Sequence, residues 1–363
     1  MVITILLGFV HGMRRTMVGT AAPGNWIIIY RGVKSEACCI DHENLRIIAA
    51  MPQLASGPSG APLISPEWPM GFDPTPDAPR ASMATLRAVH PMAFRVHRVI
   101  RLIEGRLPER GKNEWIVGQR LAARYPSLQL GSTFHWSQTD WRVAGVFSDN
   151  GSARESVAWG DFDDILTARH LSPGAFGAAS FHVVLKPGEE NSLREALHAD
   201  GRLKVDLKSE RDFYQETAEF SDQLRKLGMV VALILGAGSA FGAMNTMYAA
   251  VARRKREVGT LRALGFGRAS VLVAFVVESV ILAIAGGAIG ELLAIVLADA
   301  TGLESRLMSA GTGATAGPVF FSFSWSGSAF VAGFIVAVMI GIGGGLLPAW
   351  QAAQLNIVNA LRD

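Results

Sequence analysis

The sequence predicts an α-helical membrane protein with three clear transmembrane helices, a truncated first one, and an inserted mixed α/β domain outside the cytoplasm. Two observations predict this class. Of the 363 residues, 50% are hydrophobic and only 18% are charged, and the mean hydropathy is +0.27, which is too apolar for an ordinary soluble chain. The apolar residues are also concentrated in long runs near the C-terminus, whereas residues 24–222 contain no run long enough to cross a bilayer.

Three apolar runs have transmembrane length. Residues 227–252 contain no charged residue, and at about 1.5 Å per residue such a helix exceeds the roughly 30 Å hydrocarbon core of a bilayer. Residues 269–298 form a second span, which only Glu278 and Glu291 interrupt, and residues 328–350 form a third that we expect to end at Pro348. The chain from 223 to 363 is therefore predicted to be a transmembrane domain.

The N-terminal apolar run is shorter than the others. Residues 1–13 supply only about half of the roughly 20 residues that a transmembrane helix needs. A secretory signal peptide carries its basic residues before the apolar run, whereas Arg14 and Arg15 follow it here. We therefore expect residues 1–22 to form a partial first transmembrane helix and stalk, as a misplaced start codon or a truncated gene would produce.

The charges of the loops predict the topology. Residues 253–268 carry six basic residues and Glu257 alone as an acidic one, a balance of +5, whereas residues 299–325 carry two acidic residues and one basic residue, a balance of −1. Short loops rich in Lys and Arg stay on the cytoplasmic side. The first loop is therefore predicted inside and the second outside, which places residues 23–222 outside the cytoplasm.

The exterior region has the alternation of a mixed α/β domain. Strands are expected where β-rich runs occur and helices between them. The predicted strands are 26–30, 115–117, 141–147, 181–185 and 203–207, and the predicted helices are 41–50, 161–168 and 192–198, the last with Asn191 as its N-cap. The Pro- and Gly-rich residues 57–80 are expected to form a long irregular loop.

Three ordered motifs then support a family resemblance. The run NTMYAAVARRKREVGTLRALGF, the following span with its glycine cluster, and the closing run LLPAWQAAQLNIVNALR closely resemble the permease family typified by FtsX, MacB and LolC/LolE, which are subunits of ABC transporters. The run VIRLIEGRLPERGKNEWIVGQRLA is similar to part of the periplasmic core domain of that family. The resemblance implies four membrane helices, a MacB-like core domain at 23–222 between the first two, and a cytoplasmic coupling helix between the second and third.

The candidate functional residues belong to this coupling segment. Val258, Leu261 and Leu264 recur at helical spacing, so they form an apolar stripe that fits a protein groove. The resemblance implies that the groove belongs to a separate ATPase, and the alternative is an interfacial helix that its arginines hold on anionic lipid. The full set of predicted ATPase-coupling residues is Arg254, Arg256, Glu257, Val258, Leu261, Arg262 and Leu264.

Two further features of the spans are candidates for function or packing. A carboxylate at bilayer depth is costly, so Glu278 is expected to have a partner on a neighbouring helix, whereas Glu291 is expected to reach the headgroups. Glycine pairs at the spacing of close helix packing occur in all three spans and fit a compact bundle or a dimer interface. These pairs are Gly238 with Gly242, Gly286 with Gly290, and Gly341 with Gly345.

Sequence signatures of an enzyme are absent. The chain has no GxxxxGK[ST] phosphate loop, no HExxH and no GxSxG motif, and its eight His residues lack metal-ligand spacing, so we predict no catalytic residue, metal site or bound cofactor. ATP and Mg²⁺ are expected in a partner ATPase. The acidic residues at 161–164 are expected to stabilise a helix N-terminus. Cys38 and Cys39 are too close in sequence for an unstrained disulfide.

The functional hypothesis combines these observations with the resemblance. It is a permease subunit of the bacterial inner membrane that pairs with a second copy or a paralogue and binds an ABC ATPase. The resemblance implies a mechanical stroke that exports or extracts a drug, a peptide or a lipoprotein, with a periplasmic adaptor as a further partner. The alternative hypothesis is a signal relay that regulates a cell-wall hydrolase without transport. A membrane-anchored enzyme is the third alternative, and no motif favours it.

Overall fold

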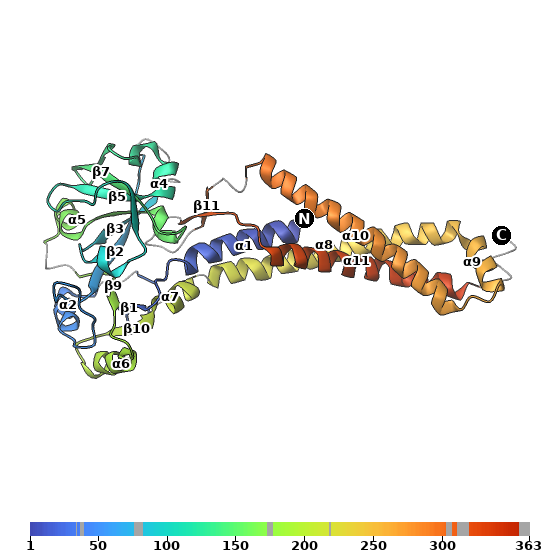
Figure 1. The fold of residues 1–363 in the computed structure, drawn as a ribbon, viewed down its shortest axis with the longest axis horizontal. Helices are drawn as coiled ribbons and strands as arrows, with labels where there is room; N and C mark the ends of the chain where they lie inside the picture. Colours follow the sequence, from blue (N-terminus) through green and yellow to red (C-terminus); the bar gives the residue numbers. More distant parts are fainter. Residues whose placement is uncertain are drawn as a thin grey trace. The chain divides into compact units, whose positions relative to one another are not determined.

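The computed structural model describes residues 1–33, 35–36, 40–75, 83–172, 177–217, 219–302, 307–310 and 319–355. The chain divides into two compact units (Figure 1). The helical unit comprises Met1–Gly12, Ser221–Arg306 and Phe323–Asp363, and the sheet unit comprises Met13–Phe220 and Leu307–Ser322. Cys38 and Cys39 lie outside the described residues.

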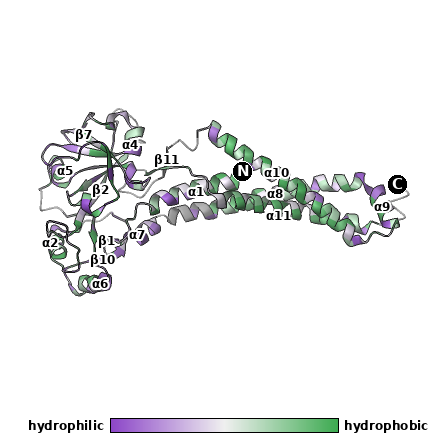
Figure 2. Ribbon diagram, in the orientation of Figure 1, coloured by the Kyte–Doolittle hydropathy of each residue, from purple (hydrophilic) through white to green (hydrophobic). Residues whose placement is uncertain are grey.

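The helical unit contains three helices that are long and apolar enough to cross a membrane, which confirms the three predicted spans. They are α8 (Glu219–Arg253), α10 (Arg268–Ala300) and α11 (Gly327–Gln354). Figure 2 shows apolar residues along most of their length. The short helix α9 (Lys255–Ala263) lies between α8 and α10 in the chain, and α1 (Val2–Val18) precedes the sheet unit. The prediction that the third span ends at Pro348 is wrong, because α11 continues through this proline to Gln354.

Small residues set the close contact of α11 with two neighbouring helices. A Cβ atom added at Gly341 would overlap the side chain of Ala283 on α10, and one added at Gly345 would overlap that of Ser279. The Ser279 hydroxyl donates a hydrogen bond to the Gly341 carbonyl at 3.0 Å. On α8, Ala243 lies against Gly344 in the same way.

The other predicted packing glycines do not meet a neighbouring helix. A Cβ atom at Gly238, Gly242 or Gly286 has nothing within 4 Å, and one at Gly290 has only the Met1 nitrogen, at 4.0 Å. Within this unit, close packing therefore involves Gly341 and Gly345. A role of the remaining four glycines in a dimer interface stays a prediction.

Glu291 has a partner on α1. Its Oε1 accepts a hydrogen bond of 2.7 Å from the Thr4 hydroxyl, and the expectation that it reaches the headgroups stays a prediction. A hydroxyl on a neighbouring helix supplies at membrane depth the hydrogen bond that the headgroup region would otherwise provide.

The sheet unit is built on a ten-stranded mixed sheet with the order β10-β1-β9-β2-β3-β8-β5-β7-β4, and β6 pairs with β7. The pairs β3–β8 and β5–β7 are parallel, and the other pairs are antiparallel. The strands are β1 (Asn25–Tyr30), β2 (Ile64–Phe72), β3 (Ala84–Val89), β4 (Arg101–Gly105), β5 (Glu114–Gly118), β6 (Thr133–Trp136), β7 (Thr139–Ser148), β8 (Val157–Asp161), β9 (Ser180–Val184) and β10 (Val205–Ser209). A separate antiparallel pair consists of β11 (Leu307–Ala310) and β12 (Val319–Ser322).

Short helices connect these strands, and the three predicted ones are confirmed. They are α2 (His42–Ala49), α5 (Phe162–Ala168) and α6 (Glu190–Ala199), and the others are α3 (Ala93–Val96), α4 (Gln119–Arg124), α7 (Glu210–Thr217), and the 3₁₀ turns η2 (Pro126–Leu128) and η3 (Ala153–Ser156). As expected, Asp161 caps α5 by accepting from the backbone N–H groups of Asp163 and Asp164. The N-cap of α6 is Glu189 rather than Asn191.

The expected loop at 57–80 is wrong, because it contains the central strand β2. Two prolines in nine residues argue against a strand, since proline cannot donate to the ladder. Here β2 pairs with β9 only from Ile64 to Glu67 and with β3 only from Glu67 to Phe72. Pro66 and Pro69 therefore each lie in a half of the strand that has a partner on one side only, where a missing N–H is tolerated.

The two faces of the sheet have different covers. Ile28 and Phe181 belong to the main hydrophobic core, whereas Ile27 and Ile29 point to the opposite face, where they pack against Phe213 on α7. Further along this second face, Trp159 packs with residues of α3, β3, β5 and β7. Buried polar side chains lie between these two apolar groups.

The contact at Gly345 generates a stability prediction with a built-in control. We expect Gly345→Ala to cost about 1–3 kcal/mol by overpacking against Ser279. Gly343→Ala places the same methyl group on the same helix with nothing within 4 Å, so only its helix propensity changes, by up to about 1 kcal/mol in the stabilising direction. Thermal unfolding of the full chain in detergent measures both, and equal melting temperatures would contradict the contact.

Candidate functional site

The elbow, defined as residues 253–268 between α8 and α10, is held to α10 by an ion pair. Arg254 is the N-cap of α9, and its Nη1 lies 3.1 and 3.0 Å from the two carboxylate oxygens of Glu278. The structure thus brings together two predicted site residues. The partner of the intramembrane carboxylate comes from the coupling segment itself.

A second arginine holds the elbow to α11. The Nη1 of Arg262 donates a hydrogen bond to the carbonyl oxygen of Leu355, directly after α11 ends. A basic side chain at the C-terminus of a helix satisfies a carbonyl that has no partner within the helix. Because α9 is continuous in the chain with α8 and α10, the elbow is connected to all three long helices.

Val258 is more buried than an outer stripe would place it, although it also lines the groove described below. It is 3% exposed and packs in a cluster, here named the elbow core, with residues of α8, α10 and α11. Leu264, by contrast, is 74% exposed and Leu261 is 43% exposed. The elbow core comprises Met247, Val251, Val258, Val271, Phe275, Ala349, Ala352 and Ala353.

The outer side of the elbow has a groove of about 310 Å³. Leu261 and Phe266 supply apolar surface, and Arg254, Glu257 and Glu278 supply charges along the groove. Arg256 is exposed on the same helix. This combination of exposed apolar side chains and flanking charges is the composition of a protein-docking surface.

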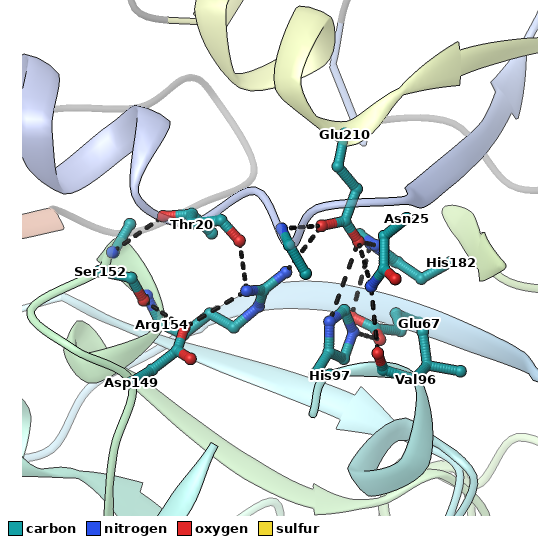
Figure 3. Close-up of polar contacts among 12 residues, drawn as sticks. Thr20, Asn25, Glu67, Val96, His97, Asp149, Ser152, Arg154, His182 and Glu210 are labelled. Carbon is teal, nitrogen blue, oxygen red and sulfur yellow. Dashed lines mark hydrogen bonds and ion pairs between the residues drawn. The ribbon is translucent and has the colours of Figure 1, made fainter. Parts of the chain in front are cut away.

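The sheet unit contains a second site, a buried polar centre that the sequence analysis did not predict (Figure 3). The strand register assembles it: Ser65 is opposite His182, and Pro69 is opposite Arg87. Because side chains two residues apart share a face, Glu67 on β2 lies beside both His182 on β9 and Arg87 on β3. His97, which directly follows α3, completes the group with its Nε2 2.6 Å from Glu67 Oε1.

Two more carboxylates surround this group. Glu210, the first residue of α7, accepts a hydrogen bond of 2.7 Å from His182 Nδ1. Glu36 lies 2.7 Å from Arg87 Nη2 and 3.4 Å from His182 Nε2. Glu67, His97 and His182 each offer one ligand atom, and these three atoms lie within 4.8 Å of one another.

The charges at the polar centre stabilise one another. Burial alone would lower the pKa of His182, but the charge of Glu67 and the hydrogen bonds with Glu210 and Glu36 raise it to about 9. Burial would raise the pKa of Glu210, but Arg154 and His182 bring it down to about 2. Burial and the charge of Arg154 lower the pKa of His97. At neutral pH His182 is therefore charged and His97 is neutral.

Arg154 on η3 extends the polar centre towards the segment that follows α1. Its guanidinium donates to the carbonyl of Thr20 and lies 3.3 Å from Asp149 Oδ2 and 3.4 Å from Glu210 Oε2. The Thr20 hydroxyl in turn accepts from the Ala153 N–H at 2.9 Å. Thr20, which follows α1, and Glu210, which begins α7, are thus both bound to the turn η3.

The same turn also binds β12, which precedes α11 in the chain. The hydroxyl of Ser156 pairs with the N–H and C=O groups of Phe320 at 2.9 and 3.0 Å, and Arg120 donates to that carbonyl at 2.9 Å. We name η3 with its contacts to Thr20, Glu210 and Phe320 the junction. The junction thus binds three segments to one turn: the segment after α1, the start of α7, and β12.

Only a weak sequence signal existed for the polar centre. Its residues lie far apart in the sequence and match no motif. The available signal was a charged or polar residue inside apolar strands, such as His182 within Phe181–Val183 and Glu67 within β2. A lone histidine or glutamate in a strand is common on a solvated face, so this signal does not distinguish a buried position.

Comparisons with known families place both halves of the chain. Residues 229–357 match the model of the FtsX-like permease C-terminal region, and residues 1–199 match that of the MacB-like periplasmic core domain. A membrane region of the first kind, with a core domain of the second kind, defines a class of permeases. The chain belongs to the family that carries the MacB-like periplasmic core domain, and the resemblance drawn from the sequence is confirmed.

Individual relatives agree with this assignment. The macrolide export ATP-binding/permease protein MacB of Bdellovibrio bacteriovorus is 25% identical over 250 residues, which are 64% of this chain and 36% of that protein. An uncharacterized ABC transporter permease of Methanocaldococcus jannaschii is 26% identical, over 71% of this chain and 65% of its own length. The uncharacterized permease YknZ of Bacillus subtilis is 28% identical, over 56% and 50%. The chain thus spans about a third of the length of the Bdellovibrio relative.

Two solved structures are similar to this chain. The periplasmic region of MacB from Actinobacillus actinomycetemcomitans aligns with a TM-score of 0.41 at 15% identity, covering 55% of this chain and 94% of that one. The extracellular domain of YknZ aligns with a TM-score of 0.39 at 12% identity, covering 51% of this chain and 99% of that one.

The elbow core generates a second prediction. We expect Val258→Asp to lower the stability of the full chain by about 3–5 kcal/mol, because it buries a charge that has no partner. Leu264→Asp changes an exposed position of the same helix and is expected to stay within about 0.5 kcal/mol. Thermal unfolding in detergent compares the two. A Val258→Asp protein as stable as the Leu264→Asp protein would show that Val258 faces outward.

Proposed function

We propose that this protein is the permease subunit of an ABC transporter and that it couples ATP hydrolysis by a separate ATPase to movement of its extracytoplasmic domain. The observation that carries the proposal is the elbow, which exposes an apolar and charged surface and is fastened to α10 and α11 by Arg254 and Arg262. The family assignment supports the same reading. ATP and Mg²⁺ belong to the partner in this proposal.

The proposed mechanism is mechanical. ATPase closure pushes the elbow, and the contacts of Arg254 and Arg262 pass the displacement to the long helices. The junction supports transmission into the sheet unit, because segments that continue into α1, α8 and α11 in the chain are bound to the single turn η3. A force on any of these segments therefore acts on the same part of the sheet.

The location and cargo follow from this proposal. A charged elbow inside and the sheet unit outside fit the inner membrane of a bacterium. The cargo is a drug, a peptide or a lipoprotein, and the partners are an ABC ATPase, a second permease copy or paralogue, membrane lipid and a periplasmic adaptor. Nucleic acid is not among the proposed partners, because the net charge is only +3.

The alternative function is a signal relay to an extracytoplasmic cell-wall hydrolase. It uses the same elbow and junction, so the two functions differ only in what the moving domain acts on. Deletion of the gene separates them, because loss of a transporter gives drug sensitivity or lipoprotein retention, and loss of a regulator gives cell chaining or lysis.

ATPase docking gives a third prediction. We expect a tagged full-length chain, purified in mild detergent, to retain an ABC ATPase that mass spectrometry identifies. The double variant Leu261→Asp/Leu264→Asp places charges on the exposed apolar surface of α9. We expect it to lose at least about 30-fold of the retained ATPase, the effect of losing a contact worth about 2 kcal/mol.

The matched control changes a leucine of equal exposure in the sheet unit. Leu130 and Leu261 are both 43% exposed, and Leu130→Asp is expected to retain the ATPase as the parent does. Equal retention by the parent and by the α9 double variant would place the docking surface elsewhere. No ATPase with any form of a correctly inserted chain would contradict the proposed function.

A further inference from the structure

We propose that the polar centre binds one divalent transition-metal ion of the Zn²⁺ class, with Glu67, His97 and His182 as ligands and Glu36 as the nearest further oxygen. This revises the prediction from the sequence, which contained no metal site. The inference does not depend on the proposed function, since it rests on side chains of the sheet unit alone.

The donor set is the first argument. Two imidazoles and one carboxylate are a ligand combination typical of Zn²⁺, which binds His nitrogen at about 2.0–2.1 Å and carboxylate oxygen at about 2.0–2.2 Å. All three residues are at most 1% exposed. Burial keeps water from competing for the ion, and a mixed nitrogen and oxygen set disfavours Ca²⁺ and Mg²⁺, which prefer oxygen alone.

The surroundings of His182 Nε2 are the second argument. This atom lies 3.4 Å from Glu36 Oε1 and 3.6 Å from Glu67 Oε2. Both distances are longer than the roughly 2.7–2.9 Å of a charge-assisted hydrogen bond. They approach the separation of about 3.3 Å between two ligand atoms of one tetrahedral Zn²⁺ ion. Nε2 therefore makes one long hydrogen bond, to Glu36, and its distances also suit a metal ligand.

The contacts around the ligands are the third argument. A metal-bound histidine commonly donates its other ring N–H to a carboxylate, which orients the ring. His182 Nδ1 has this partner in Glu210 at 2.7 Å. Arg87 Nη1 donates to Glu67 Oε2 at 2.8 Å, which orients this carboxylate. His97 Nδ1 is buried without a hydrogen bond, 3.9 Å from Glu210 Oε1.

The balance of buried charge is the fourth argument. Among the described residues, four carboxylates are linked by ion pairs to only two guanidinium groups, those of Arg87 and Arg154. Four negative and two positive charges leave an excess of two negative charges. A proton on His182 offsets one of them, whereas a divalent ion in place of that proton offsets both. The carboxylates are Glu36, Glu67, Asp149 and Glu210.

One contact must lengthen when the ion binds. His97 Nε2 lies 2.6 Å from Glu67 Oε1, closer than the roughly 3.3 Å that two ligands of one Zn²⁺ ion require. His97 directly follows the four-residue helix α3 and belongs to no strand. A shift of under about 1 Å at this position breaks no ladder hydrogen bond.

The test titrates ZnCl2 into the full chain in detergent after chelator treatment, with MgCl2 as the comparison ion. We expect one Zn²⁺ per chain by elemental analysis after gel filtration, with a Kd below about 1 µM. Co²⁺ in place of Zn²⁺ is expected to give the intense visible absorption of a four-coordinate site.

Variants locate the ion. We expect Glu67→Gln, which keeps the size of the side chain, to weaken Zn²⁺ binding at least about 100-fold, and Glu210→Gln to weaken it about 10–100-fold by releasing the His182 ring. His135→Ala removes an exposed histidine on β6 and is expected to bind as the parent does. The tryptophan fluorescence of each zinc-free variant checks its folding, and Glu210→Gln provides the test if Glu67→Gln does not fold.

Three results would overturn the proposal. The first is a parent chain that retains no zinc, in which case the polar centre is an ion-pair network with a proton on His182. The second is zinc that Glu67→Gln and Glu210→Gln bind as tightly as the parent. Zinc lost from a Cys38→Ser/Cys39→Ser variant but kept by Glu67→Gln would also place the ion elsewhere.

Discussion

The buried guanidinium of Arg154 is the interaction on which the sheet unit depends. A buried charge costs several kcal/mol unless it is paired, and Arg154 meets this requirement with Asp149, Glu210 and the carbonyl of Thr20. Glu210 then needs a second donor, which His182 supplies. One buried arginine thus forces a chain of compensating contacts through α7, β9 and β2. Removal of one member would leave the next without its partner.

In the proposed mechanism, the displacement passes from the elbow to the junction. The contacts at these two places differ in how deeply they are buried. At the junction the ion pairs are buried, so losing one partner is costly. At the elbow, Arg254 and Glu278 are 48% and 35% exposed, so less of the surrounding packing fixes their geometry. The elbow is therefore the part that can adjust to a docked partner, whereas the junction keeps its geometry.

Local patterns predicted much of the fold, and pairing between distant segments explains what they missed. The spans are long apolar runs, and the strands β1, β5, β7 and β9 contain short runs rich in β-branched and aromatic residues. The strand β2 was missed because Pro66 and Pro69 argue against a strand unless the extent of its partners is known. Val258 was placed outward because periodicity identifies an apolar face but not what covers it. The polar centre could not be predicted, because Glu67 and His182 are far apart in the sequence. Only the pairing register of β9, β2 and β3 brings them together.

The polar centre and the junction share Glu210, and this links the occupancy of one to the stiffness of the other. With a proton on His182, Glu210 accepts from an imidazolium, and the centre keeps an excess negative charge that repels this carboxylate. With a divalent ion in place of the proton, the excess is removed and the ion fixes the ring that holds Glu210. Since Glu210 begins α7, which leads into α8 in the chain, the ion would tighten the fastening of that segment. A bound metal would then stabilise the position of Glu210 and with it the geometry of the junction.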